Sequence, residues 1–105
     1  MGTNYYLRYN ICKHCSRFDQ LHIGKNSFGW KFLFSINENH KNVDDWLNDM
    51  KNSKYKIYDE YDNRISYHDF VCVIQNKELE PSRIIEYPKD FTSDGKYDYS
   101  KGEFS

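Results

Sequence analysis

The sequence predicts an α+β fold: a small antiparallel β-sheet, a meander with a Cys-x-x-Cys knuckle, packed against two short helices. Two patterns carry this prediction. Apolar side chains alternate with polar ones near the N-terminus, which is typical of half-buried strands. Two later segments place apolar side chains at helical spacing behind a residue that can cap a helix. With 105 residues the chain is too short for two independent cores, so we expect a single domain over residues 1–105.

Three strands are expected in the first third of the chain. Tyr5–Ile11 alternates between two faces, with Tyr6 and Arg8 pointing away from the apolar side. Leu21–Ile23 is a second, short strand, and Trp30–Ile36 shows the clearest alternation, with Phe32, Phe34 and both end residues on one face. Consecutive strands with short connections favour an antiparallel meander.

A helix is expected to begin after Asn42, whose side chain can cap it, with Asp45 at the position of an approximate capping box. Its apolar stripe has the spacing i, i+3, i+4 and i+7 and consists of Val43, Trp46, Leu47 and Met50. A short strand follows from Tyr55 to about Asp59.

A second helix is expected to begin after Ser66, with Asp69 at the capping-box position, and to run to about Lys77. It presents the apolar residues Phe70, Val71, Val73 and Ile74. After Pro88 the chain is polar but contains several aromatic residues. We therefore expect residues 89–105 to form a polar, aromatic-rich C-terminal tail.

Composition narrows the classes of function. Aromatic residues make up 18% of the chain and alanine is absent, so a few large rings must build the core. The 15 basic and 16 acidic residues nearly balance, which argues against a nucleic-acid binder. Mean hydropathy is −0.97 and no apolar run approaches 18 residues, so we expect no membrane span. The N-terminus lacks signal-peptide features, which predicts a cytoplasmic protein.

The knuckle residues Cys12 and Cys15 are the first candidate site. Thiolates at i and i+3 on a tight turn can reach one zinc ion. His22, on the returning strand, is the third candidate ligand, and the fourth is open among His14, His40, His68, Cys72 and the carboxylates. Two reduced thiols without a metal are the main alternative. A redox pair is a weaker one, because such pairs usually stand where a strand enters a helix.

The segment from Gly24 to Gly29 is the second candidate site. We expect a loop whose backbone N–H groups and Lys25 could hold a phosphate or nucleotide, with a ligand-binding set of Gly24, Lys25, Ser27, Gly29 and Trp30. The spacing differs from that of a P-loop. The alternative is an ordinary hairpin loop whose glycines supply positive φ angles.

The chain resembles a family of small bacteriophage and prophage proteins. The resemblance rests on MGTNYYL at the N-terminus, the Cys-x-x-Cys pair, the block LHIGKxSxGWxF, the capped helix with Phe70, and the C-terminal GEFS. Ser16 and Asn26 depart from the residues common in the family, glycine and serine. The resemblance implies a viral protein that acts in the host bacterial cytoplasm, and small accessory roles such as inhibition of host defence. It also favours Cys12, Cys15 and His22 as metal ligands.

Three functions are compatible with these observations. The first is a non-enzymatic inhibitor that contacts a host bacterial protein through the outer sheet face and through Tyr97, Tyr99 and Phe104, since aromatic residues dominate binding hot spots. The second is an oligomeric sponge that sequesters a nucleotide signal. The third is a small zinc-dependent hydrolase or nuclease, although the sequence shows no nucleophile with its base, and His40 and His68 are expected at the surface.

Overall fold

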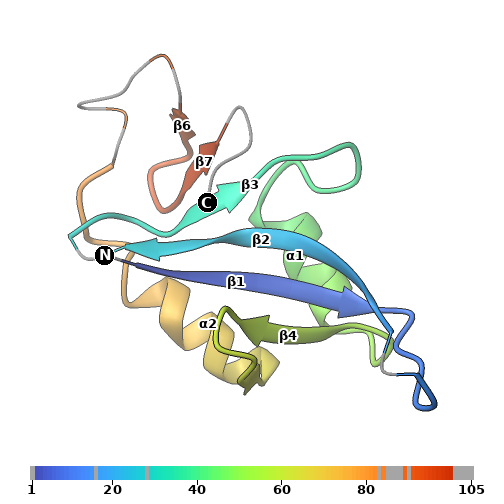
Figure 1. Cartoon of the computed structure of the whole chain (residues 1–105). Helices are drawn as coiled ribbons and strands as arrows, with labels where there is room; N and C mark the ends of the chain where they lie inside the picture. The colour runs from blue at the N-terminus through green and yellow to red at the C-terminus, as the bar shows by residue number, and fades with distance from the viewer. Residues whose placement is uncertain are drawn as a thin grey trace.

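The structure is a computed structural model of the chain in which residues 2–15, 17–27, 29–82, 84, 89 and 91–100 are described. These residues form one seven-stranded sheet, with the order β5-β4-β1-β2-β3-β7-β6, and two helices (Figure 1). The strands are β1 (Gly2–Tyr9), β2 (Asp19–Ser27), β3 (Leu33–Ser35), β4 (Lys56–Asp59), β5 (Arg64–Ile65), β6 (Phe91–Ser93) and β7 (Asp98–Ser100). The helices are α1 (Val43–Met50) and α2 (Tyr67–Gln75). The α+β fold class is confirmed.

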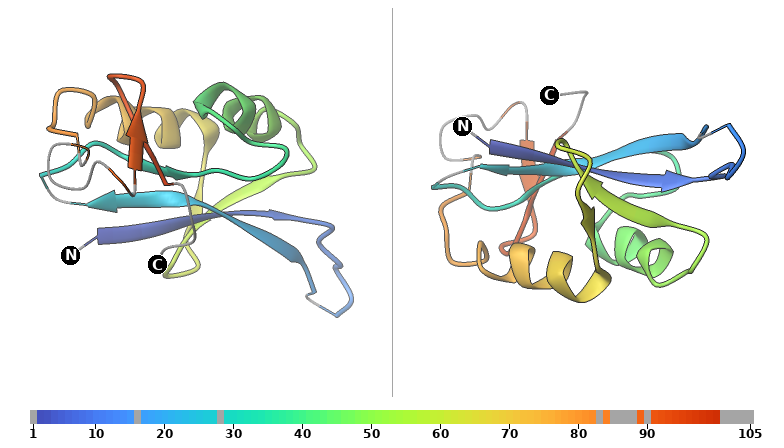
Figure 2. Two further views of the ribbon diagram at one scale, coloured as in Figure 1. Left: turned by 90° about the horizontal axis from the view of Figure 1, so that it is seen from above. Right: turned by 60° about the horizontal axis from the view of Figure 1, so that its bottom comes forward.

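The expected meander is present, because β1 pairs antiparallel with β2 and β2 pairs antiparallel with β3. Both helices lie on one side of the sheet, and neither helix covers the other side (Figure 2). The long β1–β2 hairpin runs along the longest dimension of a molecule that measures 47 × 25 × 24 Å (Figure 1). No helix of the described residues is long and apolar enough to cross a membrane.

Both predicted helix starts are confirmed. The Asn42 side chain accepts a hydrogen bond from the backbone N–H of Asp45 at 3.0 Å, and the Ser66 hydroxyl accepts one from that of Asp69 at 3.1 Å. Each bond satisfies an N–H group that has no partner within the helix. Of the apolar residues predicted to face inward, Trp46, Met50, Phe70 and Ile74 are buried, and Val43, Leu47 and Val73 pack against the core while partly exposed.

Aromatic rings form the centre of the core, as the composition predicts. Phe32 lies 4.7 Å from Phe34 and 5.5 Å from Phe70 between ring centroids, and Tyr5 lies 5.6 Å from Phe70. Phe32, Phe34 and Phe70 are completely buried. Edge-to-face pairs such as Phe32 and Phe70 add a favourable electrostatic contact to the burial of apolar area.

Two strand expectations are wrong. The segment Gly24–Ser27 was expected in a loop but belongs to β2, where Gly24 pairs with Tyr5 and Phe34. The third strand is shorter than expected, and Ile36, predicted to share the inner face, is 41% exposed.

The C-terminal part of the chain adds strands that the sequence pattern did not indicate. Strands β6 and β7 pair antiparallel with each other, and β7 pairs parallel with β3. The pairing with β3 makes residues around Tyr97–Ser100 an integral part of the sheet, with all four side chains buried. Parallel neighbours that lie more than 60 residues apart leave no local signal in the sequence.

A substitution at Gly24 tests how closely β2 packs against β3. A Cβ atom at this position would lie 2.0 Å from the Leu33 carbonyl oxygen and 2.7 Å from a Phe32 ring carbon. We therefore expect Gly24→Ala to lower the free energy of unfolding by about 1–3 kcal/mol, as overpacking does, measured by urea denaturation. Ser27→Ala in the same strand is the control and should change it by less than about 0.5 kcal/mol. Equal stability of the two variants would contradict the close approach.

Candidate functional site

The knuckle cysteines lie in the turn that joins β1 to β2. This end of the hairpin points away from the helices (Figure 1). The turn is closed by a hydrogen bond of 2.8 Å from the Cys12 N–H to the Arg17 carbonyl. Both thiols are free, with Cys12 partly exposed and Cys15 exposed. Hydrogen bonds from the backbone and side chain of Cys15, and then from the backbone of His14, lower the pKa of the Cys12 thiol. The tip thus presents two neighbouring thiols to solvent.

His22 does not lie with these thiols. It pairs with Tyr6 in the ladder between β1 and β2. The pair of Asp19 with Tyr9 ends this ladder on the side of the tip, and His22 lies three residues farther along β2, which corresponds to about 10 Å of strand. Its Nε2 lies 2.9 Å from Asn4 Oδ1, and burial, followed by the charge of Lys25, lowers its pKa. Among the described residues, no group of three or more His, Cys, Asp or Glu side chains could hold a metal. His22, the expected third ligand of a zinc site within one chain, therefore does not lie beside the two cysteines.

The expected phosphate-binding loop does not form over its first half. The backbone groups of Gly24 and Lys25 lie inside the ladder between β1 and β3, so they are not gathered around a ligand. Ser27 is the last residue of β2, and its carbonyl accepts a bond of 3.3 Å from the Trp30 N–H. Gly29, with φ of 81°, completes this turn, as the hairpin alternative predicts.

The tyrosines predicted to contact a partner are buried. Tyr97 and Tyr99 are each 6% exposed, so the expectation of an exposed contact surface there is wrong. The Tyr97 hydroxyl donates to Glu78 at 2.7 Å, and the Tyr99 hydroxyl donates to Asp94 at 2.8 Å. Burial first, and then these carboxylates, raise the pKa of both hydroxyls. Phe104, the third predicted contact, lies outside the described residues.

The face of the sheet opposite the helices, which we call the uncovered face because neither helix lies on it, carries an organised group of side chains around Arg8. The guanidinium carbon lies 4.2 Å from the ring centroid of Phe18 and 4.1 Å from that of Tyr58, so the cation stands between two aromatic rings. Its Nε donates to Gln20 at 3.0 Å, and its Nη2 forms an ion pair with Asp62. We call these five residues the Arg8 cluster.

Further side chains share this face with the Arg8 cluster. Tyr6 faces Tyr58 across the strands, and its ring lies 5.3 Å from that of His22. Three cations project from the same side because each pairs with an outward-facing residue: Lys25 with Asn4, Lys56 with Arg8, and Arg64 with Tyr58. The face is therefore aromatic and rich in cations. Alternation along β1 indicated that Tyr6 and Arg8 point outward, but it gave no sign of their partners.

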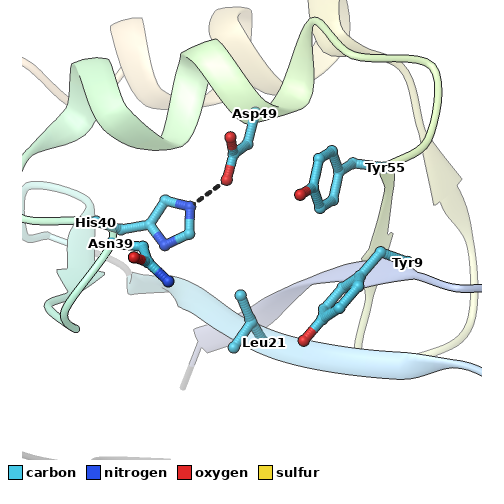
Figure 3. Close-up of a pocket in the computed structure, with 6 residues that line it drawn as sticks. All are labelled: Tyr9, Leu21, Asn39, His40, Asp49 and Tyr55. Carbon is cyan, nitrogen blue, oxygen red and sulfur yellow. Dashed lines mark hydrogen bonds and ion pairs between the residues drawn. The ribbon is translucent and has the colours of Figure 1, made fainter.

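A pocket of about 400 Å³ opens on the other side, where α1 meets the hairpin (Figure 3). Its lining residues are Tyr9, Leu21, Asn39, His40, Asp49 and Tyr55. His40, expected at the surface, is only 2% exposed because its ring stacks on Trp46 at 3.9 Å.

Both ring nitrogens of His40 are engaged. Asn37 Oδ1 accepts a hydrogen bond from the backbone N–H of His40 at 2.9 Å. Because this atom is an acceptor, the ring nitrogen Nδ1 of His40, 3.0 Å away, is the donor of the second bond. Nε2 lies 2.5 Å from Asp49 Oδ2 (Figure 3). The ring thus fastens the loop before α1 to the helix, and neither nitrogen is left over to act as a general base.

Comparison of the chain with protein-family models, with curated proteins and with solved structures gave no match. The resemblance to small phage proteins therefore stays a prediction.

The carboxylate of Asp94 gives a pH test of the buried tyrosine network. Burial raises its pKa, but hydrogen bonds from the N–H groups of Tyr97 and Lys96 and from the Tyr99 hydroxyl outweigh this effect and lower the pKa below its ordinary 3.8. The ionised carboxylate therefore stabilises the fold above about pH 4, and this contribution is lost as the pH falls through the pKa of the folded state.

We expect Asp94→Asn to lower the free energy of unfolding by about 1–2 kcal/mol at pH 7, and by much less near pH 3, in urea titrations. Glu38→Gln, a change at an exposed loop carboxylate, is the matched control and should show no such pH-dependent difference. A gap between wild type and Asp94→Asn that is the same at both pH values would contradict the role of the ionised carboxylate.

Proposed function

We propose that this protein is a non-enzymatic binding protein that contacts an acidic surface of a partner protein through the Arg8 cluster and the sheet face around it. The observation that carries the proposal is the fixed Arg8 side chain, which is held by two rings, an amide and a carboxylate on the uncovered face. The hydrogen bonds and ring contacts hold it in place before any partner arrives.

The residue types in the Arg8 cluster support a role in binding. Arginine and tyrosine are enriched among the few interface residues that supply most of the binding free energy. A side chain that is already ordered loses little conformational entropy on association, so more of its contact energy appears as affinity. Arg8 meets both conditions, and its guanidinium side chain is only 15% exposed in the free protein.

The charges on this face favour an acidic partner. Lys56 and Arg64 lie directly opposite members of the Arg8 cluster, and Lys25 lies farther along the same face opposite Asn4. Complementary charge speeds encounter and selects partners. A protein fits better than a nucleic acid, because both rings that stack on Arg8 are already engaged and are less open to bases.

The source of the partner rests on the resemblance to phage proteins. This resemblance favours a partner that is a protein of the host bacterial cytoplasm. The outcome of binding would be antagonism of a host defence system. The nucleotide sponge and the zinc hydrolase have less support. The nucleotide sponge needs an open loop at Gly24 and Lys25, but the backbone there is paired with β3. The zinc hydrolase needs three metal ligands within one chain, and the described residues do not bring three together.

A photo-crosslinking amino acid at Gln20, on the uncovered face, tests the contact in bacterial cells. We expect it to capture a protein that the same amino acid at Asn48 does not capture, because Asn48 is exposed on α1 at the opposite side. Capture of nucleic acid from position 20, or equal capture of the same protein from position 48, would contradict the proposal.

The captured partner, once purified, allows a quantitative test. We expect Arg8→Ala to weaken its affinity by about 30-fold, the loss typical of a hot spot, measured by calorimetry at fixed salt. Arg8→Lys should fall between wild type and Arg8→Ala, because lysine keeps the charge but loses the planar contacts. Asn48→Ala is the control for unchanged affinity, and circular dichroism verifies that each variant is folded. An Arg8→Ala protein that is folded and binds like wild type would overturn the proposal.

A further inference from the structure

We propose that the hairpin tips of two copies of this chain share one zinc ion, with Cys12 and Cys15 of each copy as its four ligands. The site would be formed only when two chains meet tip to tip, so that a symmetric dimer and the metal centre depend on each other. This inference uses other residues than the proposed binding face and does not rest on it.

The ligand geometry leads to two chains rather than one. A structural zinc site is tetrahedral and closed by four ligands. The tight turn between Cys12 and Cys15 supplies two thiols to one ion, and no third metal-binding side chain joins them among the described residues. His22, the nearest candidate in the sequence, is held within the sheet by Asn4. A second copy supplies the two missing thiolates and makes the site symmetric.

The position of the thiols allows this approach. They lie at the end of the hairpin, which projects along the long dimension of the molecule beyond the helices (Figure 1). Two tips can therefore meet without a collision between the bodies of the two proteins. Ile11, next to Cys12, is 44% exposed at this tip. Apolar side chains that flank a projecting turn gain free energy when a second surface covers them.

Charge makes the pairing depend on the metal. Lys13 and Arg17 are exposed in the same turn, so two tips without metal bring four fixed cations together and repel one another. Zn²⁺ with four thiolates carries two net negative charges, which these cations offset. Binding converts four thiols and Zn²⁺ into the tetrathiolate complex and releases four protons, so affinity falls as the pH falls.

Native mass spectrometry and light scattering of the full chain, with zinc as the probe, test the proposal. We expect zinc to convert a monomer into a dimer that holds one zinc per two chains, and a chelator to reverse the change. Cobalt(II) in place of zinc should give thiolate-to-metal absorption typical of four sulfur ligands. Cys12→Ser and Cys15→Ser should each abolish the dimer, whereas Cys72→Ser, at an exposed cysteine of α2, should leave it intact.

The substituted tips should remain folded, because the cysteines lie beyond the last ladder pair of β1 and β2. We expect Cys12→Ser to keep the metal-free thermal midpoint of wild type, which separates loss of metal binding from loss of fold. One zinc per monomer, no zinc binding at micromolar concentrations, or a dimer that persists in Cys12→Ser would each overturn the proposal. Binding of the partner protein should be unchanged in Cys12→Ser, so failure here leaves the proposed function untouched.

Discussion

The close approach of β2 to β3 at Gly24 is the constraint on which the rest of the structure depends. With no Cβ atom at this position, the carbonyl oxygen of Leu33 and the ring of Phe32 lie where a side chain would stand. Pairing at this distance places Phe32 and Phe34 against Phe70 of α2, which is the centre of the core. It also sets β3 in the interior of the sheet, with its second edge open to β7.

One-sided burial has a direct functional consequence. Both helices pack on the face that holds the aromatic core, so no helix of the described residues forms a second layer above the outward side chains of β1, β2 and β4 (Figure 2). Polar and aromatic side chains on such a face form hydrogen bonds and ring contacts with one another or with a binding partner. The Arg8 cluster does the first, since each ring, amide and carboxylate around the guanidinium is already in contact. That order makes the face suitable for a partner, because little entropy remains to be lost.

Polar contacts join α1 to the loop before it and to β7. His40 joins the loop at Asn37 to Asp49 of α1 while its ring covers Trp46. Asp94 plays a similar part at the other end of α1, where the Tyr99 hydroxyl accepts from the Val43 N–H and donates to the carboxylate. Because these groups are buried or partly buried, loss of one partner leaves another without its hydrogen bond, which costs more than the bond itself contributes. At the hairpin tip, the bond from the Cys12 N–H to the Arg17 carbonyl closes the turn and leaves both thiols free.

The sequence by itself determined the elements whose signals are local. Asn42 and Ser66 cap the helices as expected, and the buried residues of both helices and Tyr5 and Leu7 of β1 follow from periodicity, because these patterns depend on neighbours within a few residues. The same alternation was wrong for Ile11, which lies beyond the end of β1 and is 44% exposed. Only the tertiary structure decided the rest. Phe18, Tyr58 and Asp62 reach Arg8 from distant parts of the chain, and Tyr97 and Tyr99 are buried because β7 pairs with β3. Such contacts join residues 10 to more than 60 positions apart, so no pattern along the chain encodes them.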